Sequence, residues 1–142
     1  MHRLDRCLLQ FNCISLPNST FNIHNPLRIK YLTRIRVGFS HLKEHKFRHN
    51  FQDSVDMMCS CGSAVETTKH FFLYCANFIF QRQTLFDKIN LLDENILTEN
   101  EESIVNTLLF GIPNSENSLN KAIINATIEY ILSTERFNGP LF

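Results

Sequence analysis

The residues best suited to chemistry lie near the middle of the chain, in the pattern C-x-C-G-x7-H-x4-C. They are Cys59, Cys61, His70 and Cys75. Three thiolates and one imidazole form a standard closed tetrahedral set for Zn²⁺. Gly62 allows a tight turn after the first cysteine pair. Because the protein supplies all four ligands, the pattern predicts a structural zinc ion rather than a catalytic one.

The alternative is that these four side chains are simply buried, since cysteine is among the most buried residue types. However, Cys59 and Cys61 lie in a polar loop, and a hydrophobic core does not explain a C-x-C-G pattern there. The chain has five cysteines and shows no clear secretion signal, which favours a metal site or free thiols over a disulfide framework. Cys7 and Cys13 match no metal-binding spacing, and we expect them to be free or buried.

The second candidate site is a basic segment, residues 28–48. The chain as a whole has 14 Lys and Arg against 14 Asp and Glu. Residues 1–50 nevertheless contain nine basic and two acidic residues, whereas residues 51–142 contain five and twelve. Such asymmetry indicates that the first half would meet a polyanion. The predicted phosphate contacts are Arg34, Arg36, Lys43, Lys46 and Arg48. The alternative is a solvated cationic face.

The aromatic and histidine residues of this segment have two interpretations each. Tyr31, Phe39 and Phe47 could stack on bases, but Phe39 shares an apolar helical stripe with Tyr31, and we expect it in the core. Three histidines follow at spacings of four: His41, His45 and His49. They lack the carboxylate of the zinc-protease motif. We therefore expect them on a polar face, where they would aid phosphate contacts when protonated.

Helical spacing dominates the rest of the sequence, so we expect a mainly α fold: a small helical domain with a short irregular zinc-knuckle insert. Four segments of one compact domain are expected, namely a poorly defined segment 1–25, a basic helical segment 26–50, the CCHC insert 51–76 and C-terminal helices within 68–142. Pro26 should occupy the first helical position, after Asn25 as N-cap. No apolar run is long enough to span a membrane.

Helix boundaries can be predicted in the C-terminal part. Thr67 or Thr68 should cap a helix of about five turns that ends near Asn90. Thr98 and Glu101 fit a capping box for a second helix that stops at Gly111. A third helix should end at Asn138-Gly139-Pro140.

Little in the sequence supports catalysis. Asp53 and Asp56 form a lone carboxylate pair, and the chain lacks a glycine-rich phosphate loop and a nucleophile elbow. We therefore expect a protein that is not an enzyme, located inside the cell, in the nucleus or the cytoplasm.

Several stretches resemble, when taken together, the C-terminal tail of LINE-type (non-LTR) retrotransposon polyproteins. They are LTRIRVGFSHL at 32–42, EHKFRHNFQD at 44–53, CSCG at 59–62 and ETTKHFFLYC at 66–75, and residues 108–111 and 128–137 are similar to the final helices. By this resemblance, the three cysteines and His70 take the zinc-knuckle positions. Arg34, Arg36 and Gly38 take the positions of the preceding basic motif.

The resemblance covers roughly residues 20–142 and implies a role in binding RNA or DNA. In the family, this tail follows the reverse transcriptase domain, whose catalytic aspartates are missing from this sequence. The expected function is therefore a non-catalytic nucleic-acid-binding module derived from such a polyprotein. The alternatives are a structural or protein-interaction domain that contacts a partner through the acidic C-terminal helices, and a retroelement remnant without function.

Overall fold

The computed structural model describes residues 26–51 and 55–141, and these form a mainly helical fold, as predicted. The helices are α3 (Pro26–Arg36), α4 (Lys43–Arg48), α5 (Ile79–Leu92), α6 (Glu101–Phe110) and α7 (Asn117–Thr134), with shorter turns η1 (His70–Tyr74), η2 (Ala76–Phe78) and η3 (Ile96–Thr98). Segment 1–25, the Asn25 cap and Asp53 lie outside the described residues. Pro26 takes the first helical position, as expected.

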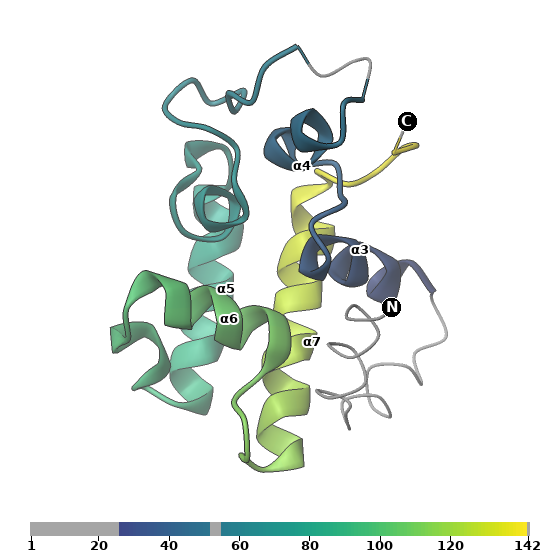
Figure 1. Cartoon of the computed structure of the whole chain (residues 1–142). Coiled ribbons are helices and arrows are strands. Elements are labelled where there is room, and N and C mark those ends of the chain that lie inside the picture. Colours follow the sequence, from purple (N-terminus) through teal and green to yellow (C-terminus); the bar gives the residue numbers. More distant parts are fainter. Residues whose placement is uncertain (1–25, 52–54, 142) are drawn as a thin grey trace.

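α7 is the central helix of the fold, because α3, α5 and α6 all pack against it (Figure 1). Its buried residues cover a wide face: Ile123, Ile124, Ala126, Thr127, Ile128, Tyr130, Ile131 and Thr134. The buried hydroxyl of Thr127 donates a hydrogen bond to Leu108 O of α6 at 2.7 Å. Among the described helices, none has the length and apolar character needed to cross a membrane.

Aromatic side chains form the core at one end of α7. Phe71 lies at its middle, with ring centroids 4.9 Å from Phe72, 5.1 Å from Tyr130 and 5.3 Å from Phe137. Tyr31 of α3 is buried beside Phe137, at 5.8 Å. Tyr31 therefore belongs to the core and is not available to stack on a base. Since Phe71 and Phe72 follow His70 directly, this core also fixes one of the predicted metal ligands.

α3 and α4 are separated where Gly38 takes a left-handed conformation, with φ at 76°. Only glycine adopts this conformation without strain. The chain turns there, and the prediction that Phe39 lies in the core is wrong: Phe39 is 36% exposed. Its ring contacts the rings of His49 at 4.9 Å and Phe51 at 5.5 Å instead.

The long helix predicted from residue 68 to about residue 90 is also wrong, because it is interrupted at Cys75. Residues 70–74 form one π-helical turn, closed by a 2.8 Å hydrogen bond from Cys75 N–H to His70 O. Cys75 itself is extended, and α5 begins at Ile79. In a continuous α-helix, residues five apart point about 140° apart. The π-turn removes this separation and directs His70 and Cys75 to the same side.

The remaining helix ends agree only in part with the prediction. Gly111, with φ at 82°, ends α6 as expected. The cap at its start is Asn100, whose side chain accepts a hydrogen bond from Ser103 N–H, and not Thr98. α7 ends at Thr134, before the predicted Asn138, because Glu135 is left-handed with φ at 54°.

Candidate metal centre

The four predicted ligands come together in one cluster. Their Sγ and ring nitrogen atoms all lie within 4.8 Å of one another. Cys59 Sγ is 3.6 Å from Cys75 Sγ, and Cys61 Sγ is 3.3 Å from His70 Nε2. All three cysteines are free thiols. This donor set of three sulfur atoms and one nitrogen atom fits a metal ion, with Cys59, Cys75 and His70 buried and Cys61 partly exposed.

The first cysteine pair lies on a tight turn with little regular structure around it. Cys59 N–H donates to Ala64 O and Gly62 N–H donates to Cys59 O, each at 2.9 Å. An isolated antiparallel bridge between Met58 and Val65 closes the turn. Gly62 has φ at 83°, a value that explains why glycine stands there.

The second pair of ligands is held by the π-turn and by side chains from three directions. Thr67 Oγ1 accepts a 3.0 Å hydrogen bond from His70 N–H, which confirms Thr67 as a cap. Arg82 Nη2 donates to Cys75 O at 2.7 Å, and Tyr130 Oη donates to Phe71 O at 2.6 Å. Arg82 and Tyr130 thus satisfy two backbone carbonyls that a continuous α-helix would have satisfied by itself.

The surroundings shift the thiol pKa values in opposite directions. Hydrogen bonds from the Ser63 hydroxyl and backbone lower the pKa of Cys61 to about 5. Burial raises the pKa of Cys75 to about 12. A buried thiolate at Cys75 therefore requires a compensating positive charge, and a bound cation supplies one.

Glu66 connects the metal cluster to the rest of the fold, and the sequence did not reveal this. Its carboxylate receives two hydrogen bonds from Arg136, at 2.7 Å each, and a third from Lys43 N–H at 2.9 Å. Arg136 also donates to His41 O at 2.8 Å. The loop that follows the first cysteine pair is thereby joined to α4 and to the end of α7. The only indication of this role in the sequence was that Glu66 is an acidic residue within 66–75, one of the stretches that resemble the LINE polyprotein tail.

The structure separates the five predicted phosphate contacts. Arg36 lies against α6: its Nε donates to Leu109 O at 2.6 Å and its guanidinium lies over the Phe110 ring. Lys43, Lys46 and Arg48 belong to α4, where Arg48 forms an ion pair with Glu44 at 2.7 Å. Arg34 is half-buried near the end of α3. Of the five predicted contacts, only Lys43, Lys46 and Arg48 therefore lie together on one helix.

The predicted polar histidine face is wrong for two of its three members. His41 and His45 are buried, and burial lowers the pKa of both, that of His45 to about 4. His45 is hydrogen-bonded to Ser40 Oγ at 2.8 Å and Thr68 Oγ1 at 3.3 Å. These histidines are therefore neutral structural groups and not phosphate contacts. His49 is exposed.

Comparisons with known proteins give no further assignment of this site. No family model, no curated protein and no solved structure matches the chain.

Proposed function

We propose that this chain is a non-catalytic nucleic-acid-binding module folded around a structural Zn²⁺ ion. The four-ligand cluster carries the proposal. With bonds of about 2.3 Å to sulfur and about 2.0 Å to nitrogen, a tetrahedral zinc site places sulfur atoms about 3.8 Å apart and sulfur about 3.5 Å from nitrogen. The distances of 3.6 Å between Cys59 and Cys75 and 3.3 Å between Cys61 and His70 are close to these values.

The proposed role of zinc is to fold the segment from Met57 to Cys75. This segment has little regular structure: one isolated β-bridge, and one short helical stretch that begins at residue 68 and ends in the π-turn. Binding of zinc to such sites contributes on the order of 10 kcal/mol to folding. The ion would link the Cys59 turn to the π-turn, whose Phe71 and Phe72 are anchored in the core.

The proposed nucleic-acid surface is α4 with its neighbouring aromatic residues. Lys43, Lys46 and Arg48 lie within six residues of one helix, and Glu44 is the one acidic residue among them. Phe47, between two of these cations, is 43% exposed. Cations that contact phosphates beside an exposed ring that stacks on a base are typical of single-strand binding. Arg34 remains a further proposed contact, whereas Arg36 is used within the fold.

The resemblance to the LINE polyprotein tail supports the same role, since that tail is thought to bind template RNA or target DNA. It would make this chain a derivative of a reverse transcriptase polyprotein that lacks the polymerase itself.

A metal-content measurement tests the zinc half of the proposal. The purified chain should contain one zinc ion, and Cys59→Ser should lose it. Cys13→Ser is the matched control and should retain full zinc content, because Cys13 is not among the proposed ligands. A wild-type chain without bound metal would contradict the proposal.

Salt-dependent binding to a single-stranded RNA tests the other half. For four phosphate contacts, from the three cations of α4 and Arg34, the logarithm of the binding constant should fall linearly with the logarithm of the salt concentration, with a slope of about −3. The double variant Lys43→Ala, Lys46→Ala should reduce this slope by about 1.4. Binding that is independent of salt, or unchanged in the double variant, would rule out α4 as the contact surface.

A further inference from the structure

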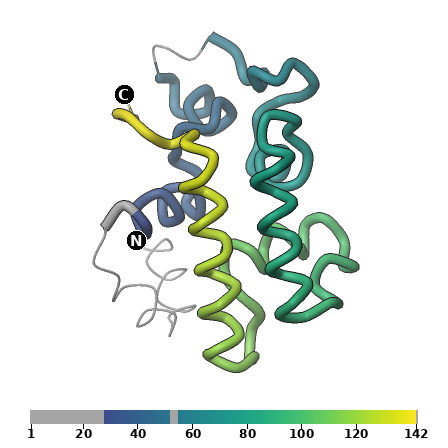
Figure 2. The backbone as a smooth tube through the Cα atoms, turned by 180° about the vertical axis from the view of Figure 1, so that it is seen from behind, coloured from purple at the N-terminus to yellow at the C-terminus, as the bar shows by residue number. Residues whose placement is uncertain are grey.

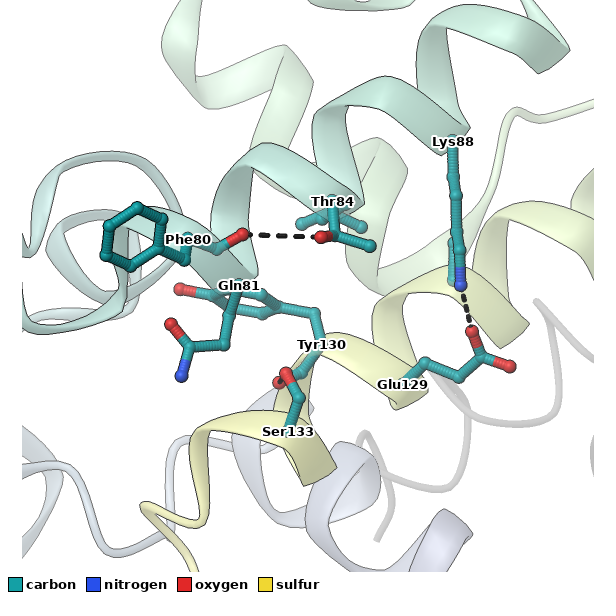
Figure 3. A pocket seen from close by; sticks show the side chains of 9 residues that line it. Phe80, Gln81, Thr84, Lys88, Glu129, Tyr130 and Ser133 are labelled. Carbon is teal, nitrogen blue, oxygen red and sulfur yellow. Dashed lines mark hydrogen bonds and ion pairs between the residues drawn. The ribbon is translucent and has the colours of Figure 1, made fainter.

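α5 and α7 lie side by side (Figure 2). An open groove runs along the outer surface of the pair. Two hollows of ≈ 530 Å³ and ≈ 410 Å³ make up this groove and share Lys88, Ala126 and Glu129. Figure 3 shows the larger one, with Phe80, Lys88 and Glu129 among its lining residues. The first hollow places Phe80 near Ser133, and the second places Leu91 near Ala122. The two helices are therefore antiparallel, and the groove extends for about three helical turns.

The α5 side of the groove has large apolar side chains at both ends. Phe80, Thr84, Lys88 and Leu91 follow at helical spacing. Phe80 is 85% exposed and Leu91 is 87% exposed. The described residues bury neither of them. Exposed apolar side chains gathered on one surface of this kind mark an interaction site.

The α7 side is complementary to this pattern. Its residues at the groove are Ala122, Asn125, Ala126, Glu129, Tyr130 and Ser133, and three of these six have small side chains. Small residues opposite large ones let helices pack closely. In the middle of the groove, Lys88 forms an ion pair with Glu129 (Figure 3). The groove thus carries one cation on the α5 side and one anion on the α7 side.

We propose that this α5–α7 face binds a second copy of the chain, about a twofold axis that runs along the groove. Such a rotation places α5 of each copy over α7 of the other, in antiparallel orientation. Phe80 then meets Ser133 of the other copy, and Leu91 meets Ala122. The product is an antiparallel four-helix bundle, in which every helix has antiparallel neighbours.

The central charges select this axis. Rotation about the groove direction brings Lys88 of each copy over Glu129 of the other, so opposite charges meet twice. A twofold axis across the groove would bring the two Lys88 side chains together, and like charges repel. The face is therefore self-complementary in both shape and charge in only one of the two orientations.

Sedimentation of the full-length, metal-loaded chain across the micromolar range tests the proposal. The wild type should show a monomer–dimer equilibrium, and Phe80→Glu should weaken it at least about tenfold. Val55→Glu is the matched control, since Val55 is also 85% exposed but lies outside the α5–α7 face. A wild type that is monomeric throughout, or a control that weakens the dimer equally, would overturn the proposal.

Charge reversal provides the sharper test. Lys88→Glu and Glu129→Lys should each be monomeric, because each places four like charges along the axis. Their equimolar mixture should restore a one-to-one dimer, in which every glutamate faces a lysine. Both side chains are about half exposed, so either variant should keep its helical circular dichroism and metal content. A mixture that stays monomeric, or single variants that dimerise like the wild type, would reject the proposed arrangement.

Discussion

Arg136 binds Glu66 through two parallel hydrogen bonds of 2.7 Å each, and so joins the end of α7 to the loop that carries Cys59 and Cys61. The Glu66 side chain is 4% exposed and that of Arg136 is 25% exposed. Removal of one partner from a buried ion pair leaves the other charge without compensation.

We therefore predict that Glu66→Gln destabilises the fold by about 3 kcal/mol, as measured by denaturant unfolding. Glu101→Gln is the matched control: Glu101 pairs with Lys69 on the surface, and its loss should cost at most about 1 kcal/mol. Combining Glu66→Gln with Arg136→Gln should cost less than the sum of the single changes. Additive effects would show that the two side chains do not act as a pair.

Arg82 holds the carbonyl of Cys75, and we predict that it positions this ligand. Arg82→Leu should reduce zinc affinity by about 10- to 100-fold in a chelator competition, as is typical when a partner of a metal ligand is lost. Its exposed neighbour serves as control, since Gln83 contacts Asp87 and no ligand. Gln83→Leu should leave zinc affinity unchanged. Equal affinities in Arg82→Leu and the wild type would contradict the positioning role.

Tyr130 supports the same π-turn through a hydrogen bond to Phe71 O. Tyr130→Phe leaves a buried carbonyl without its donor, and we predict a loss of about 1–3 kcal/mol in unfolding free energy. Because the ring remains in the core, the packing around Phe71 should be retained. A neutral effect would mean that another donor replaces the hydroxyl.

The metal cluster could be predicted because the residues of each ligand pair lie close together in the sequence. The C-x-C-G turn and the H-x4-C spacing each fix two ligands within a few residues. The ion pair of Glu66 with Arg136 joins positions 70 residues apart, and no sequence pattern connects them. Helical fold class was predictable in the same way, because apolar periodicity is a local property.

The predicted helices and buried faces were wrong where the helical spacing of the sequence continues beyond the point at which the helical backbone ends. Phe39 fits the apolar stripe of α3, yet the left-handed Gly38 ends the helix before it. Residues 68–90 fit one helix by their apolar spacing, yet residues 70–74 form a π-turn and Cys75 is extended. His41 precedes α4 and His45 lies within it, and their spacing of four did not show that both side chains are buried.

Phe47 provides a test of base stacking on α4 that is separate from charge. Phe47→Ala should weaken binding to single-stranded RNA by about 1–3 kcal/mol while the salt slope stays the same. Phe47→Tyr keeps an aromatic ring and should retain wild-type affinity. If Phe47→Tyr and Phe47→Ala bind equally, stacking makes no contribution, although phosphate contacts could persist.

Burial of His45 should make the stability of the fold depend on pH. Burial is the largest influence on its pKa, ahead of the charges of Glu44, Arg48, His49 and Glu66. In the folded chain the His45 pKa is about 4, compared with 6.5 in an unfolded chain. Between these values the unfolded state binds more protons. The stabilisation is therefore complete above pH 6.5 and decreases as the pH falls toward 4.

We predict that His45→Gln removes this part of the pH dependence. The wild type should lose up to about 1.4 kcal/mol per pH unit more than the variant as the pH falls from 6.5. The difference between the two proteins is the relevant quantity, because all other titratable groups are common to both and their contributions cancel. Denaturant unfolding of both metal-loaded chains from pH 7.5 to about 5 measures it. Parallel stability curves would show that His45 is protonated equally in the folded and unfolded states, which its burial beside Ser40 and Thr68 argues against.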